Sequence, residues 1–152
     1  KELFQNTVLV INRRDYSQAE VEDWASCGNN LSNIKERIET HYFVVAVNQQ
    51  SQIVGFSSIT PQGYLHSMFV HKDFQGEGIA TMLLEEIERY AITAGITRIT
   101  SEVSLTARPF FEKKGYAVEK EQKRKANQLS LTNFLMAKEV AFLEYYNKKV
   151  TD

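Results

Sequence analysis

The sequence predicts a mixed α/β (α+β) fold, in which a central, twisted, mostly antiparallel sheet contains one parallel pair of strands and carries helices on both faces. Two observations lead to this prediction. Three strand-like runs between residues 42 and 70 are joined by short polar turns, which favours an antiparallel meander. A segment with helical periodicity then separates the third run from a fourth, and a crossover of that length joins parallel neighbours.

The composition is that of an ordinary globular chain of 152 residues, and we expect one domain over residues 1–152. The formal net charge of −1 argues against a strongly basic nucleic-acid-binding protein. The single cysteine, Cys27, excludes an intramolecular disulfide framework and a zinc site made of several cysteines. With one cysteine, a reducing cytoplasm is the simplest setting, and we expect no metal and no nucleic-acid partner. Apolar runs are too short for a membrane helix, so we expect no membrane partner.

The first forty residues predict one strand followed by a helical hairpin. Thr7–Ile11 is β-branched and apolar, which indicates a short strand. Ser17 is a suitable helix N-cap, and Glu20 three residues later completes a capping box. The run from Gly28 to Asn30 ends that helix, and a second helix follows as far as Thr40.

The remaining elements alternate between strand and helix. Strands are predicted over Tyr42–Val47, Ile53–Ile59, Tyr64–Val70 and Thr97–Val103, with a closing hairpin made of Tyr116–Lys123 and Leu129–Val140. Apolar residues recur at helical spacing from Ile79 to Ala94, ahead of Gly95, and a shorter helix is predicted over Thr106–Lys114. Residues 141–152 are a candidate helical extension.

The segment from Val70 to Ala80 places a strand, a glycine-containing turn and a long helix in that order. The first turn of a helix has free backbone N–H groups and a positive partial charge, and glycines there let an anion approach the backbone. Gly78 is followed by Ile79 and Ala80, which argues against a Walker A nucleotide site. An ordinary helix start and a nucleotide-binding structural module remain alternatives to a phosphate site for another ligand.

Three motifs in this order resemble the Gcn5-related N-acetyltransferase (GNAT) family. Gln75–Ala80 reads Gln-Gly-Glu-Gly-Ile-Ala, which is similar to the family's Gln/Arg-x-x-Gly-x-Gly/Ala signature, and Leu65–Val70 looks like the strand before it. Ser104–Tyr116 resembles the later block Asn-x-x-Ala-x-x-x-Tyr-x-x-x-Gly-Phe. The segments Asp15–Ala25 and Asn133–Lys138 look like a bacterial, uncharacterised branch. The resemblance implies a GNAT-like fold and acyl transfer from acetyl-CoA (coenzyme A), without a metal.

The resemblance also implies which residues bind the coenzyme. The backbone of Met68, Phe69 and Val70 should pair with the pantetheine arm. Backbone N–H groups should surround the pyrophosphate, and they belong to Gln75, Gly76, Glu77, Gly78, Ile79 and Ala80. Ser104 stands where the family has Asn, and Phe110 and Phe111 should pack beside the thiol. Many members have Tyr where this chain has Phe111, and phenylalanine cannot donate a proton to the leaving thiolate.

Two residues are candidates for the catalytic base that takes a proton from the attacking ammonium. His66 precedes the glycine turn, and strand alternation predicts that it shares a face with Tyr64 and Met68. Arylalkylamine-acetylating members of the family carry a His at the matching position. Glu102 lies near the end of the strand predicted to be parallel, where some peptide-acetylating members use a Glu.

The predicted function is transfer of an acetyl group from acetyl-CoA to a primary amine of a small molecule or peptide. Direct attack in a ternary complex is expected, because no nucleophilic Cys or Ser is apparent. The missing tyrosine at position 111 keeps a second hypothesis open, a non-catalytic acyl-CoA-binding or regulatory domain. A homodimer is an expectation drawn from the family alone.

Overall fold

The computed structural model describes residues 1–140 and 149–150, so nearly all of the candidate extension over 141–152 lies outside the described residues. The helices are α1 (Glu2–Val10), α2 (Gln18–Ser26), α3 (Leu31–Thr40), α4 (Ile79–Thr93) and α5 (Arg108–Lys113), with short 3-10 turns at Asn12–Arg14 and Cys27–Asn29. The strands are β1 (Tyr42–Val47), β2 (Ile53–Ile59), β3 (Tyr64–Val70), β4 (Arg98–Ser104), β5 (Ala117–Lys125) and β6 (Ser130–Glu139).

The strands form one sheet in the order β1-β2-β3-β4-β6-β5. The β3–β4 pair is parallel and the other neighbours are antiparallel, which confirms the predicted fold class. The parallel pair arises from the crossover through α4, as the helical segment between the strands requires. The closing hairpin is also confirmed, with β6 lying between β4 and β5.

The predicted strand at Thr7–Ile11 is wrong, because these residues belong to the end of α1 and the residue after it. Val8 and Ile11 are buried, and Phe4 packs in the same cluster, so the apolar positions recur three or four residues apart. A short β-branched run fits either a strand or a buried helix turn, and here the tertiary contacts favoured the helix. The capping box of Ser17 and Glu20 at the start of α2 is confirmed.

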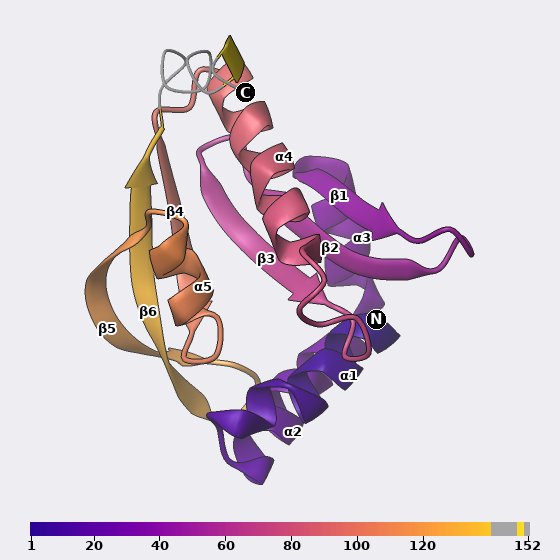
Figure 1. Cartoon of the computed structure of the whole chain (residues 1–152). Coiled ribbons are helices and arrows are strands. Elements are labelled where there is room, and N and C mark those ends of the chain that lie inside the picture. Colours follow the sequence, from indigo (N-terminus) through magenta and orange to yellow (C-terminus); the bar gives the residue numbers. More distant parts are fainter. Residues whose placement is uncertain (141–148, 151–152) are drawn as a thin grey trace.

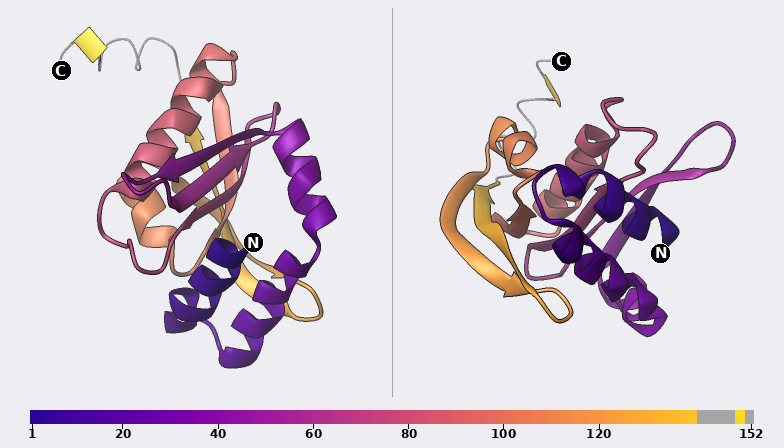
Figure 2. Two further views of the ribbon diagram at one scale, coloured as in Figure 1. Left: turned by 90° about the vertical axis from the view of Figure 1, so that its right-hand side faces the viewer. Right: turned by 90° about the horizontal axis from the view of Figure 1, so that it is seen from below.

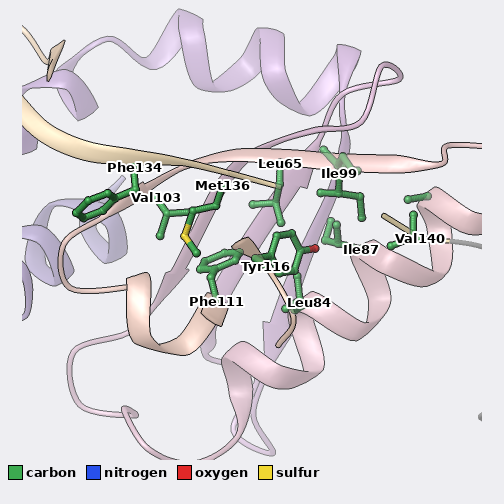
Figure 3. Packing of buried hydrophobic residues seen from close by; sticks show 12 residues of the cluster. Leu65, Leu84, Ile87, Ile99, Val103, Phe111, Tyr116, Phe134, Met136 and Val140 are labelled. Atoms are coloured by element: carbon green, nitrogen blue, oxygen red, sulfur yellow. The ribbon is translucent and has the colours of Figure 1, made fainter. Parts of the chain in front are cut away.

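Helices cover both faces of the sheet, and each face has its own apolar cluster. On one face, α4 and α5 bury Leu84, Ile87 and Phe111 against Leu65 and Ile99 (Figure 3). On the other face, Val8 of α1 and Val21 of α2 pack with Tyr16 and Leu131. Figure 2 shows α3 on this second face, opposite α4.

The two N-terminal helices lie across the end of the sheet where β3 and β4 have diverged (Figure 1). Thr7 Oγ1 of α1 donates a hydrogen bond to the Val70 carbonyl at the end of β3 (2.9 Å). The carboxylate of Asp23 in α2 accepts hydrogen bonds from the backbone N–H groups of residues 127 to 129, in the β5–β6 turn. The helical pair is therefore attached to both halves of the sheet.

Within the described residues, α4 is the longest helix at 15 residues, and no helix is long and apolar enough to cross a membrane. The same residues contain no cluster of three or more His, Cys, Asp or Glu side chains that could hold a metal ion.

Candidate active site

A gap in the backbone pairing of the sheet forms the centre of the candidate site. β3 and β4 pair only at Tyr64–Thr100 and Leu65–Ser101, near the start of both strands. Beyond these residues the two strands separate, and Figure 1 shows them diverging toward their C-terminal ends. The facing edges of the two strands are consequently unpaired with each other beyond Leu65 and Ser101.

The hydrogen-bond pattern between β2 and β3 determines which backbone groups face this gap. His71 N–H donates to the Val54 carbonyl (2.8 Å), and hydrogen-bonded pairs alternate along an antiparallel ladder. Phe69 therefore bonds to β2, whereas the N–H and C=O groups of Met68 and Val70 point toward the gap. The Val70 carbonyl already accepts from Thr7 Oγ1 and from Gln75 Nε2 (2.7 Å). This leaves the Met68 amide groups and the Val70 N–H for a ligand strand.

The glycine turn at the end of β3 provides a second set of free donors. Gly76 and Gly78 have φ angles of +74° and +82°, a conformation in which most side chains are strained. A Cβ at either position would meet nothing within 4 Å, so the space beside the turn is open. Gly78 is the N-cap of α4 and no side chain caps this helix, so its first N–H groups point outward.

Two side chains hold the turn in this shape. The Gln75 amide group donates to the Val70 carbonyl, which anchors the turn to the end of β3. His71 Nδ1 accepts a hydrogen bond from the Asp73 N–H (3.1 Å), so this histidine organises the turn. Both contacts leave the backbone N–H groups around Gly76 and Gly78 free for an anion.

His66 lies at the point where the strands begin to separate, and its predicted orientation is only half right. It contacts Tyr64 edge to face, with ring centroids 5.9 Å apart, as the shared face requires. Met68, however, packs on the α4 side with the core around Leu65, while Phe69 packs with the α1–α2 cluster. The reason is a β-bulge, because His66 is the extra residue where the β2–β3 register shifts.

The surroundings of His66 keep its imidazole neutral. Burial is the main cause that lowers its pKa to about 4, and the positive charge of Arg37 and the neighbouring His41 add to the effect. Its Nδ1 atom is buried without a hydrogen-bond partner. His66 and His41 line a pocket of about 300 Å³ together with Arg37 and other residues of α3.

Glu102 lies on the same face of the sheet as His66. Ile99 and Val103 belong to the core under α4, so the alternating positions of Thr100, Glu102 and Ser104 face the α3 side. The Glu102 carboxylate pairs with Arg124 Nε at 3.0 Å. Burial raises the pKa of Tyr64 to about 12, and the Glu102 charge contributes to this rise. The structure thus brings the two candidate bases to one face, where His66 contacts the ring of Tyr64.

The residues predicted for the thiol end differ in their surroundings. Phe111 is 3% exposed and belongs to the core, where its ring meets Phe110 and Tyr116 edge to face. Phe110 is only partly buried at the edge of that core. Ser104 Oγ accepts a hydrogen bond from the Ala107 N–H (3.0 Å), so its oxygen helps to hold the start of α5.

The structure adds four residues to those predicted to bind the coenzyme or act as the catalytic base. Thr7 binds the β3 carbonyl beside the gap, and Tyr16 links the helical pair to β4 and β6. Arg37 and His41 lie one helical turn apart at the end of α3, and both line the pocket beside His66. That spacing was the only available signal, and it is too common on helices to indicate a site by itself.

Known proteins resemble this chain along most of its length. The sequence model described as "Acetyltransferase (GNAT) domain" matches residues 12–139. The uncharacterized N-acetyltransferase YafP of Escherichia coli is 28% identical over 135 residues, which cover 88% of this chain and 83% of that protein. The peptidyl-lysine N-acetyltransferase YjaB of Salmonella typhimurium is 32% identical over 74 residues, 49% of each chain.

The same relationship appears in three dimensions. A GCN5-related N-acetyltransferase from Rhodopseudomonas palustris superimposes with a TM-score of 0.87 at 27% identity, covering 91% of this chain and 86% of that one.

Proposed function

Because the chain belongs to the GNAT acetyltransferase family, we propose that it transfers an acetyl group from acetyl-CoA to a primary amine by direct attack in a ternary complex. Acetyl-CoA-dependent acetylation is the general activity of the family. The separation of β3 from β4 after two paired residues is the observation that carries the proposal, because it leaves backbone groups of β3 unpaired by β4 up to the glycine turn.

The chain has donors suited to the phosphate and amide groups of coenzyme A. The free N–H groups around Gly76 and Gly78 and the positive end of α4 suit a pyrophosphate. The Met68 N–H and C=O and the Val70 N–H would pair with the pantetheine amides as a neighbouring strand does. A pantetheine arm that runs back along β3 from the turn brings the thioester toward Met68 and the bulge at His66.

The acceptor amine would approach from the α3 face, where His66 and Glu102 lie. The His66 imidazole stays unprotonated throughout the physiological pH range, because its pKa lies near 4, so a ring nitrogen is available as a proton acceptor. The same low pKa makes it a weak base, so it is suited to relay a proton to the Glu102 carboxylate or to water. The Met68 N–H, which faces the gap, would polarise the thioester carbonyl.

The coenzyme thiolate would leave without protonation by a side chain at position 111. Phe111 has no exchangeable proton and lies in the core. A thiol has a pKa near 8.5, so the thiolate is a tolerable leaving group at neutral pH and can take its proton from water.

Calorimetric titration of acetyl-CoA tests the proposed coenzyme site. Gly78→Ala should weaken binding by roughly tenfold or more, because the new methyl group enters the space beside the turn where a phosphate would approach. Gly95→Ala is the matched control, since Gly95 has a φ of +80° and equally open surroundings but lies at the far end of α4. Equal affinities in both variants, or no binding to the wild type, would refute the coenzyme site.

The second candidate function is a non-catalytic acyl-CoA-binding domain, and the absence of a hydroxyl at position 111 favours it. An assay of thiol release with a panel of primary amines separates the two functions. Turnover of any amine would establish an enzyme, whereas tight acetyl-CoA binding without thiol release from any amine would favour the binding domain.

A further inference from the structure

Arg37 is a cation in the acceptor-side pocket without a carboxylate partner. It is half-buried, and within the described residues its guanidinium makes no hydrogen bond or ion pair. The other two half-buried arginines, Arg89 and Arg108, both pair with a glutamate. A guanidinium that has lost part of its hydration without a protein partner is suited to bind an anion.

The charge of Arg37 affects the titratable groups around the pocket. Burial is the main cause of the pKa shifts of His41, His66 and Tyr64. The charge of Arg37 adds to the lowering of both histidine pKa values and opposes the rise of the Tyr64 pKa. Glu36 also lines the pocket, but among these three groups its charge affects His41 alone. The pocket therefore has one acidic and one basic side chain from α3, and of these two only Arg37 acts on His66.

The charges on this face favour one kind of acceptor. The charges of Arg37 on α3 and of Glu102 on β4 act on Tyr64 in opposite directions. A single guanidinium beside neutral imidazoles suits a monovalent carboxylate better than a phosphate dianion. At about 300 Å³ the pocket is at the lower end of the range for small-molecule sites.

We propose that this pocket is the acceptor site for a small amine that also carries a carboxylate, such as a free amino acid. Arg37 binds the carboxylate, and the amino group points toward His66 and Glu102. This inference rests on the acetyltransferase function proposed above, and it names the substrate class of that same site.

The test compares each amino acid with the amine that lacks only its carboxylate, for example phenylalanine with phenethylamine and histidine with histamine. Thiol release gives kcat/KM for each member of a pair. The wild type should prefer the amino acid, and Arg37→Gln should lower that preference roughly tenfold to a hundredfold, mainly through KM. Arg37→Lys should retain part of it. Lys35→Gln, an exposed cation on the same helix, should leave the ratio unchanged.

A binding measurement that needs no turnover accompanies the kinetics. Phenylalanine titrated into the protein should shift the NMR signals of the His41 and His66 rings, and Arg37→Gln should abolish the shift. Turnover of carboxylate-free amines or lysine peptides alone would overturn the amino acid site and leave the acetyltransferase function standing. Phenylalanine binding that depends on Arg37, in a protein that does not bind acetyl-CoA, would retain the site and refute the proposed function. A preference that survives Arg37→Gln would refute the role of Arg37.

Discussion

Tyr16→Phe removes one hydroxyl oxygen, which joins the N-terminal helices to β4 and to β6. The Tyr16 hydroxyl donates to the Thr132 carbonyl of β6 (2.6 Å) and accepts from the Leu105 N–H at the end of β4 (2.9 Å). The residue is 4% exposed, so water cannot easily replace the lost contacts. The phenyl ring fills the same space, and the cost arises from the two backbone groups left without their partner.

We expect this change to lower the free energy of unfolding by about 2 to 3 kcal/mol. An unsatisfied buried polar group costs about 1 to 3 kcal/mol, and the Thr132 carbonyl and the Leu105 N–H belong to residues that are only half-buried. For a chain of 152 residues this corresponds to a fall in Tm of about 6 to 9 °C. Urea unfolding followed by circular dichroism provides the measurement.

Tyr116→Phe is the matched control for this prediction. Tyr116 is also almost fully buried, but its hydroxyl makes a single, longer contact with Glu88 Oε2 (3.4 Å). Removing the Tyr116 hydroxyl should lower the free energy of unfolding by less than about 1 kcal/mol. If the two variants are equally stable, the hydroxyl of Tyr16 does not hold the helical pair to the sheet and the reasoning fails.

Two further predictions concern His66. The unfolded chain protonates this imidazole near pH 6.5 and the folded protein only near pH 4, so the unfolded state binds more protons between these values. The free energy of unfolding should therefore fall as the pH drops below 6.5. In urea unfolding at pH 4.5, His66→Gln should remove about 2 kcal/mol of that loss. If the variant's stability depends on pH as the wild type's does, His66 is not a buried neutral imidazole. In the thiol-release assay, His66→Gln and Glu102→Gln should each lower kcat by roughly tenfold to a thousandfold, and normal rates with unchanged pH profiles in both variants would exclude this pair as the proton acceptors.

Much of the fold follows from local patterns in the chain. The three meander strands, the crossover helix and the capping box at Ser17 were predictable because each depends on side-chain periodicity or on a short motif. The glycine turn was predictable for the same reason, since Gly76 and Gly78 both adopt positive φ angles that other residues avoid. By contrast, Thr7–Ile11 was misassigned because its β-branched residues fit both a strand and a buried helix turn.

The sequence by itself determined the family, the order of the strands along the chain and the glycine turn before α4, because these depend on residues close together in the chain. Only the tertiary structure decided how the candidate acceptor side is built. A bulge of one residue places His66 on the face opposite Met68, and no local sequence pattern predicts this bulge. The packing of α3 against the sheet then brings Arg37 and His41 beside His66, and β4 places Glu102 on the same face. These contacts join residues far apart in the sequence, so they exist only once the chain has folded.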